Sequence, residues 1–229
     1  MSWNVGRLYT PTGNNRLAEA DVFRVARSLR ALEADVILLQ EVASKAQLGR
    51  LLDLLPGYDG RVAERCGYDR HVAALARVAL KPAFEQHRLE PTGRGLVAVT
   101  FELGSLRGAA HAVHLDVRQQ LRKRSQVEAI LAIAARRPEA VVILGGDFNT
   151  DPVWAKRLRM SVDAASFDRL AGGFDDAGRD AGPTAMRLLR VDHIFVRRPI
   201  EQPMTMRVEH RPRLPLGDHA PIVLDVLGA

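Results

Sequence analysis

Acidic, amide and histidine side chains stand where the apolar runs of this sequence begin or end. Glu41 follows VILLQ, Asp147 and Asn149 follow VVILGG, and His114 closes the run HAVH. The full set is Asn4, Glu41, His114, Asp147, Asn149, Asp192, Asp218 and His219. Side chains at the junction of a rigid strand and a loop are typical of preorganised sites. The sequence therefore predicts one site assembled from several strand ends.

These residue types favour metal-assisted chemistry on a phosphate ester. Carboxylates and carboxamides, with no thiolate among them, suit a hard cation such as Mg²⁺ or Mn²⁺. Histidines beside carboxylates suit proton transfer and the stabilisation of a charged transition state. A metal, an activated water and positive side chains are what hydrolysis of a phosphate ester requires. Each residue alone has an ordinary alternative: Glu41 could be a solvated strand end, Asp147 or Asp218 a turn residue, and His114 a core histidine.

Short apolar strands and amphipathic helices must position these side chains. Apolar runs predict strands over residues 36–39, 71–80, 96–103, 109–115, 141–144, 191–196, 204–208 and 222–227. Helical spacing predicts helices over 22–32, over 48–55 after a Ser44 cap, over 119–137 and over 162–170. In the third helix the inward residues should be Leu121, Ile130, Leu131 and Ala134.

The order of these elements indicates the fold class. Strands that follow one another without an intervening helix imply antiparallel pairs, which a doubly wound parallel sheet does not have. Two packed sheets with helices outside satisfy the order. Because the chain shows no repeat, linker or low-complexity tract, we predict a single domain over residues 1–229.

The composition bounds the partners and the compartment. The net charge of +6, from 33 basic and 27 acidic residues, fits a polyanionic partner such as nucleic acid or a phospholipid surface. Cys66 is the single cysteine, which excludes a disulfide framework and a cysteine-based zinc site. No apolar run approaches the roughly 20 residues of a membrane span, and no signal peptide is evident. We therefore expect a cytoplasmic monomer, although a truncated N-terminus could hide a leader.

Five motifs, taken together and in this order, resemble those of the endonuclease/exonuclease/phosphatase superfamily. They are WNV, LLQEV, GGDFNT, VDHIFV and GDHAPI, and they span essentially the whole chain. The resemblance implies an α/β (α+β) four-layer sandwich of the deoxyribonuclease I type, with two mixed β-sheets face to face and helices outside. It also implies a Mg²⁺- or Mn²⁺-dependent phosphodiesterase.

The resemblance implies a role for each residue at the metal and the phosphate. Glu41 would be the principal metal ligand, with Asn4 beside it at the metal or the phosphate and Asp218 completing the metal environment. Asp147 would position or deprotonate the attacking water, or join a second metal. Asn149 would bind the substrate phosphate through its carboxamide.

The resemblance also implies two catalytic histidines. His219 would lie close to the scissile phosphate, oriented by Asp192. His114 would be the second histidine of the deoxyribonuclease and sphingomyelinase branches, whereas abasic-site endonucleases have a tyrosine there. Asp69 would be the acidic partner that orients His114, and its alternative is a turn aspartate after Gly67.

The sequence departs from the family pattern in small ways, and it leaves the substrate open. Only Met1 and Ser2 precede the WNV motif, and Gly217 stands where serine is commoner before the final DH pair. The basic run RQQLRKR could contact phosphates or form a solvated helix face. We favour a nuclease acting on DNA or RNA; the alternatives are a phospholipid, a sphingomyelin-like lipid, and a sugar or inositol phosphate. The intact residue set argues against a catalytically dead scaffold.

Overall fold

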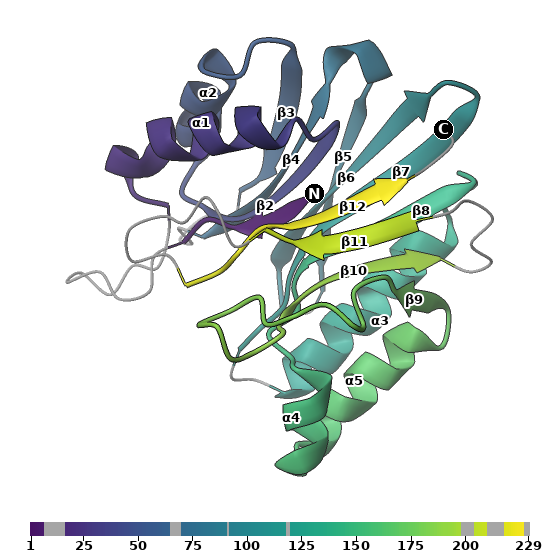
Figure 1. Cartoon of the computed structure of the whole chain (residues 1–229). Coiled ribbons are helices and arrows are strands. Elements are labelled where there is room, and N and C mark those ends of the chain that lie inside the picture. Colours follow the sequence, from purple (N-terminus) through teal and green to yellow (C-terminus); the bar gives the residue numbers. More distant parts are fainter. Residues whose placement is uncertain are drawn as a thin grey trace.

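The computed structural model describes residues 1–6, 17–64, 70–90, 92–117, 120–197, 204–209 and 218–226. Within these residues the chain forms two six-stranded sheets that lie face to face, with helices on both outer sides (Figure 1). This is the four-layer sandwich that the sequence predicts. Cys66, Gly217 and the candidate orienting residue Asp69 lie outside the described residues.

Each sheet is mixed, because one parallel pair interrupts otherwise antiparallel neighbours. In spatial order the first sheet contains β11 (Met204–Val208), β12 (Ile222–Val226), β1 (Ser2–Asn4), β2 (Val36–Val42), β4 (His71–Arg77) and β3 (Tyr58–Ala63). The second contains β5 (Ala83–Leu89), β6 (Arg94–Leu103), β7 (Leu106–His114), β8 (Val141–Asp147), β10 (Asp192–Arg197) and β9 (Phe174–Asp176). The parallel pairs are β1 with β2 and β7 with β8.

Helices cover the outer face of each sheet. The first sheet packs against α1 (Val22–Leu32) and α2 (Lys45–Asp53), and the second against α3 (Gln120–Ala135) and α5 (Ser161–Ala171) (Figure 1). The short helix α4 (Pro152–Arg157) packs against α5. Two short 3₁₀ turns cover Glu19–Asp21 and Val78–Leu80. A third apolar cluster, including Leu38, Ala74 and Ala110, fills the space between the sheets. The molecule therefore has four layers in the order helices, sheet, sheet, helices, with an apolar core between each pair of neighbouring layers.

Local sequence explains where the helices begin. The Ser44 hydroxyl accepts a hydrogen bond from the Gln47 amide at 3.2 Å, so the predicted cap of α2 is confirmed. The Asp151 carboxylate caps α4 in the same way, accepting from the amides of Val153 and Trp154. Among the described helices, none is both long and apolar enough to cross a membrane.

The prediction for the inner face of α3 is partly wrong. Ile130 and Ala134 are buried as expected, but Leu121 is 76% exposed. Lys123 and Gln126 take the inward positions of the first helical turns, and each is fully buried. This part of the helix lies beside the polar ends of β7 and β8, so it meets hydrogen-bonding groups rather than apolar side chains.

Apolar runs in the sequence do not predict several of the observed elements, and most of these lie at sheet edges. The strands β3, β5 and β9 are edge strands with polar, partly exposed sequences, and edge strands carry such sequences because one side faces water. The strand β1 has only three residues, and α4 only six. The predicted strand over 71–80 ends at Arg77 and gives way to a 3₁₀ turn.

Candidate active site

Strand register in the second sheet sets three candidate residues in a row. The strands β7, β8 and β10 are neighbours, with β8 in the middle. Parallel pairing places His114 opposite Asp147, and antiparallel pairing places Asp192 opposite Asp147. The three residues lie at the same end of the sheet. The backbone pairing of the three strands therefore brings these residues together.

Two glycines allow β8 to reach this position. The predicted strand ends at residue 144, but β8 continues through Gly145 and Gly146 to Asp147. A Cβ at Gly146 would lie 1.9 Å from the Val113 carbonyl oxygen, and one at Gly145 would lie 2.7 Å from Leu38 Cδ1. Glycine is required here because neighbouring chain segments approach the strand closely, not because the chain turns.

The first sheet supplies Asn4 from the end of β1 and Glu41 from the end of β2. The Asn4 amide Nδ2 donates to Asp147 Oδ2 at 3.0 Å, which joins the two sheets across the site. Asn4 Oδ1 accepts from the Gly6 amide at 3.0 Å. Glu41 has a φ of +64°, and the register of β2 against β4 shifts beside it. Such an irregularity re-aims a side chain, here into the site.

A tight turn after β8 brings Asn149 to the same place. Asp147 Oδ1 accepts a hydrogen bond from the Asn149 amide at 2.8 Å, and Asn149 Nδ2 donates to the Leu115 carbonyl at 2.9 Å. Asn149 has a φ of +49°, a conformation that asparagine tolerates better than most residues. Phe148, between the two site residues, is buried and packs edge-on against Phe195.

His219 is held in one orientation by Asp192. Its Nδ1 lies 2.7 Å from Asp192 Oδ2, and its carbonyl accepts from the Trp3 indole at 3.2 Å. The Nε2 atom lies 3.9 Å from Asp147 Oδ2 and 3.8 Å from Asp218 Oδ2. Burial alone would lower the pKa of His219, but the carboxylates of Asp192, Asp147 and Asp218 raise it to about 10. His219 is therefore the cationic histidine of the site.

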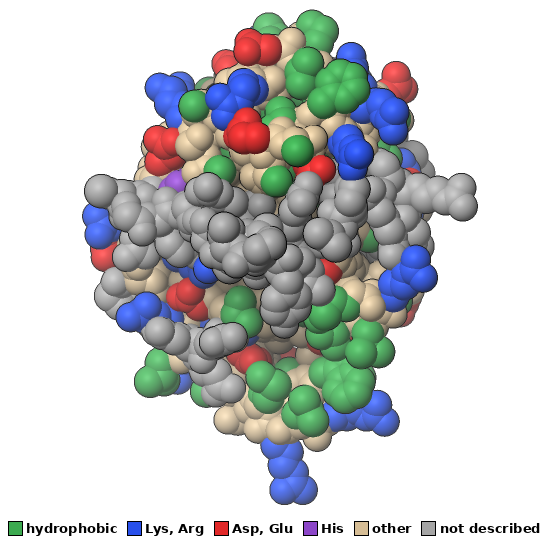
Figure 2. Space-filling view, turned by 90° about the vertical axis from the view of Figure 1, so that its left-hand side faces the viewer, with side chains coloured by type: hydrophobic (Ala, Val, Ile, Leu, Met, Phe, Trp, Pro, Cys, Tyr) green, Lys and Arg blue, Asp and Glu red, His purple; other side chains and the backbone are tan. Residues whose placement is uncertain are grey.

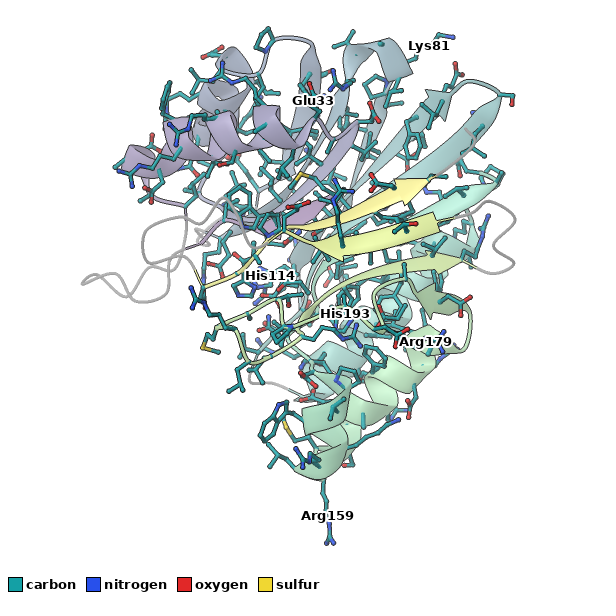
Figure 3. The ribbon with its side chains drawn as sticks, viewed as in Figure 1. Glu33, Lys81, His114, Arg159, Arg179 and His193 are labelled. Carbon is teal, nitrogen blue, oxygen red and sulfur yellow. The ribbon has the colours of Figure 1, made fainter. Side chains whose placement is uncertain are left out.

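His114 has the opposite electrostatic character. It is buried, with Nε2 3.7 Å from Asp147 Oδ2 and 3.9 Å from Glu41 Oε1 (Figure 3). Burial, with the nearby charges of Arg94 and Arg70, lowers the pKa of His114 well below its ordinary value. Its Nδ1 has no hydrogen-bond partner among the described residues. The two histidines are thus set up for different tasks.

The carboxylates of the site are costly to keep charged. Burial, followed by the neighbouring Asp147, raises the pKa of Glu41 to about 8. Burial also raises the pKa of Asp147 to about 6, against the opposing charge of His219 and with a contribution from Asp192. One oxygen of Asp192 is buried without a hydrogen-bond partner among the described residues. Buried carboxylates that repel one another suit a divalent cation, because the cation would offset their repulsion.

Sequence reasoning missed Arg94, and it expected the run RQQLRKR, which contains Lys123, to contact phosphates or solvent, whereas Lys123 is buried. Arg94 donates to the His114 carbonyl at 3.2 Å and forms an ion pair with Asp116 at 2.8 Å. Lys123 donates to the Asn149 carbonyl at 2.8 Å. Arg94 gives no signal in the sequence. Lys123 does, because it shares a helical stripe with Ile130 and Ala134.

The end of the sandwich at the left of Figure 1 faces the viewer in Figure 2. Blue Lys and Arg side chains stand around the margin of this end, and hydrophobic side chains gather at its lower right. Exposed apolar residues occur in the segments that follow β7 and β8 and precede β10, and they are Val117, Leu121, Val153, Leu158, Met186 and Leu188. The surroundings of the site therefore carry charged side chains of both signs together with apolar ones.

The architecture and the site together define a deoxyribonuclease I-like sandwich with acidic residues and histidines at one shared edge. The model of the Endonuclease/Exonuclease/phosphatase family matches residues 1–219, so the chain belongs to this family. Its members are hydrolases that act on phosphate esters and are typically metal-dependent. Among curated proteins, none matches the sequence.

Solved structures agree on the fold. Truncated TDP2 from Caenorhabditis elegans has a TM-score of 0.74 at 18% identity, covering 98% of this chain and 95% of that one. A functionally unknown conserved protein from Enterococcus faecalis V583 has a TM-score of 0.78 at 16% identity, covering 100% and 98%. A mannosyl-6-phosphatase from Bacteroides thetaiotaomicron has a TM-score of 0.70 at 16% identity, covering 99% and 98%. At such identities the likeness supports the fold alone.

Proposed function

We propose that this protein is a Mg²⁺- or Mn²⁺-dependent phosphodiesterase that hydrolyses nucleic acid. The observation that carries the chemistry is the convergence on Asp147 of His114, Asp192 and Asn4, with His219 locked to Asp192 at 2.7 Å. The choice of nucleic acid rests on the net charge of +6 and on Arg70 and Arg94, whose charges act on His114.

In this proposal Asp147 orients the attacking water and accepts its proton. Its two oxygens are fixed separately, Oδ2 by Asn4 and Oδ1 by the Asn149 amide. A raised pKa makes its carboxylate a better base than an ordinary aspartate, because the proton it accepts is bound more tightly.

The two histidines and Asn149 face the phosphate. His219, cationic and oriented by Asp192, stabilises negative charge on the phosphorus oxygens and protonates the leaving oxygen. His114, neutral and buried, donates or accepts a hydrogen bond without adding charge. The Asn149 carboxamide binds a phosphate oxygen.

Glu41, with Asn4 and Asp218, would hold the metal ion. Asp147, Asp192 and His219 also offer atoms within 4.8 Å of one another. We assign His219 to proton transfer rather than to the metal, because its contact with Asp192 through Nδ1 orients the ring for that role. When bound, the ion supplies Lewis-acid stabilisation of the phosphoryl oxygens.

A substrate panel tests the proposal. Purified protein with Mg²⁺ or Mn²⁺ is offered plasmid, single-stranded DNA, RNA, bis-p-nitrophenyl phosphate and sphingomyelin. We expect turnover of the generic diester and of at least one nucleic acid, and loss of both in EDTA. Turnover of the diester with every nucleic acid left intact would reject the nuclease assignment and leave the phosphodiesterase.

A phospholipid or another amphiphilic phosphate ester is the second candidate. The exposed apolar side chains beside the site, such as Val153 and Leu188, favour it, because apolar patches on a protein surface often mark contacts with lipid or protein. Preferential hydrolysis of sphingomyelin in vesicles over every nucleic acid would select this candidate.

A further inference from the structure

The helix α3 connects β7 to β8, so its first turns pass beside the ends of both strands that carry site residues. Its inward stripe consists of Lys123, Gln126, Val127, Ile130 and Ala134, all buried. The last three are apolar and pack on the sheet. The first two are polar and fully buried. A buried lysine is costly unless it is paired, so the partners of Lys123 identify what it is for.

Lys123 holds the turn that contains Asn149. Its Nζ donates to the Asn149 carbonyl at 2.8 Å and to Thr150 Oγ1 at 2.9 Å, and it forms an ion pair with Asp163 Oδ1 at 2.8 Å. The Thr150 hydroxyl in turn donates to the Phe148 carbonyl at 3.2 Å. Asn149 adopts a positive φ, a conformation that persists where the surroundings support it. Lys123 provides that support from α3.

The same turn is held from the opposite side by His193 of β10. Its Nε2 lies 3.0 Å from the Thr150 carbonyl, and its Nδ1 lies 2.9 Å from Arg190 Nη1. The same Nδ1 also lies 3.2 Å from Asp176 Oδ2. His193 is fully buried and points away from the site toward α5 and β9 (Figure 3).

Gln126 holds the segment that follows His114. Its Oε1 accepts from the Asp116 amide at 3.0 Å, and its Nε2 donates to Asp116 Oδ2 at 2.9 Å and to Thr92 Oγ1 at 3.2 Å. Asp116 is also paired with Arg94, which donates to the His114 carbonyl. Lys123 and Gln126, one helical turn apart on the same face of α3, therefore contact the segments that follow both strands.

We propose that Lys123 and Gln126 are positioning residues for the reaction, Lys123 through Asn149 and Gln126 through His114. The proposal rests on the proposed function, because it assigns these two residues to the same site. Neither side chain touches the reacting atoms. Their task is to fix, from α3, two strand ends that are joined directly to each other through Leu115, whose amide donates to the Asp147 carbonyl and whose carbonyl accepts from Asn149 Nδ2.

The experiment compares Lys123→Met with Lys81→Met. Lys81 forms an equally short ion pair, 2.8 Å from Glu102, but it is exposed and lies at the far end of the molecule (Figure 3). The double variant Lys123→Met/Asp163→Asn removes both charges of the buried pair and guards against unfolding. We expect kcat on bis-p-nitrophenyl phosphate to fall about 10²-fold in the Lys123 variants, with KM nearly unchanged. Lys81→Met should match the wild type.

A double-mutant cycle separates positioning from general stability. If Lys123 acts through Asn149, Lys123→Met should lower kcat little further in an Asn149→Ala background. Gln126→Leu should instead remain additive with Asn149→Ala and be non-additive with His114→Ala. A folded Lys123→Met/Asp163→Asn protein with wild-type kcat, or losses that multiply fully in the Lys123–Asn149 cycle, would overturn the proposal.

A readout without metal or substrate distinguishes this proposal from the proposed function. Hydrogen exchange of the Asn149 amide in metal-free protein should accelerate in Lys123→Met/Asp163→Asn and stay unchanged in Lys81→Met. If the wild type hydrolyses no phosphate ester, the proposed function fails, while faster exchange would still show that Lys123 holds the turn. Unchanged exchange would overturn the role of Lys123 whatever the activity.

Discussion

At the scale of single residues, the contact between His219 and Asp192 has the clearest chemical consequence. Asp192 orients the imidazole and is the leading cause of its raised pKa. Asp192→Asn keeps the side-chain shape but removes the charge that contributes most to the raised pKa of His219, so the cationic form of His219 should be less favoured. We expect kcat on bis-p-nitrophenyl phosphate to fall about 10²–10⁴-fold, as for other lost general acids. In His219→Ala, kcat should fall by at least the same factor.

The exposed carboxylate Asp53 provides the control for this prediction. Asp53→Asn makes the same chemical change at the end of α2 and should leave kcat unaltered. An Asp192→Asn protein that is folded and as active as the Asp53→Asn protein would contradict the role given to His219.

A second residue-scale prediction concerns stability in acid. His111 is buried in β7, and burial lowers its pKa from 6.5 to about 4. Between these values the unfolded chain takes up a proton that the folded protein does not, so stability present above pH 6.5 is lost as the pH falls toward 4. The loss should be about 2 kcal/mol between pH 7 and pH 5.

Urea unfolding of His111→Gln at both pH values checks this. Glutamine can still donate to the Ile143 carbonyl, which lies 3.0 Å from His111 Nδ1, but it does not titrate. The variant should lose less stability than the wild type on acidification. His87→Gln, at a partly exposed neighbour, should have a smaller effect. Equal pH dependence in His111→Gln and the wild type would exclude His111 as the cause.

At the scale of elements, the approach of β7 to β8 decides whether the site can form. Gly146→Ala would put a methyl group 1.9 Å from the Val113 carbonyl oxygen, so one of the two central strands must move. We expect a loss of at least about 3 kcal/mol in the free energy of unfolding. Gly49→Ala is the matched change, since a Cβ there meets nothing within 4 Å.

Gly49 lies inside α2, where alanine is the better helix former, so Gly49→Ala should be neutral or stabilising by up to about 1 kcal/mol. Chemical denaturation of both variants makes the comparison. If Gly146→Ala were as stable as Gly49→Ala, the packing that aligns His114 with Asp147 would be wrong.

The element scale also shows what the sequence could not reveal. Core strands such as β2 and β8 are recognisable from their apolar runs, and the two-sheet arrangement follows from the order of the strands. Edge strands such as β5 do not, because their polar side chains face water. The inward turn of Lys123 was missed because hydrophobicity alone places Leu121 inside, and only the strand-end carbonyls and Asp163 make a buried lysine favourable.

At the scale of the whole molecule, the site is a product of two sheets that meet. Asn4 and Glu41 come from one sheet and His114, Asp147 and Asp192 from the other, so no segment of the chain forms the site alone. Sequence motifs identified these residues because their types and order match a family. Their register, the bulge at Glu41 and the contrasting pKa values of the two histidines required the three-dimensional structure.

The charge of the whole molecule gives a prediction about binding. If nucleic acid is the substrate, His219→Ala should bind it without cleavage, and the Kd should rise steeply with NaCl because bound phosphates release counterions. Fluorescence anisotropy with labelled DNA and RNA between 50 and 200 mM salt, about the range over which such contacts weaken, measures this. A Kd that does not change with the salt concentration would contradict an electrostatic role for the net charge of +6.

The effect of Glu41→Gln on metal-dependent turnover is the most direct test of the site as a whole. Hydrolysis of bis-p-nitrophenyl phosphate is measured for the wild type, Glu41→Gln and the half-exposed control Glu102→Gln, each in Mg²⁺ and in EDTA. The wild type and Glu102→Gln should be active in Mg²⁺ and inactive in EDTA, and Glu41→Gln should be inactive in both. Full activity of a folded Glu41→Gln protein, or of the wild type in EDTA, would contradict a metal-assisted hydrolase at this edge of the sandwich.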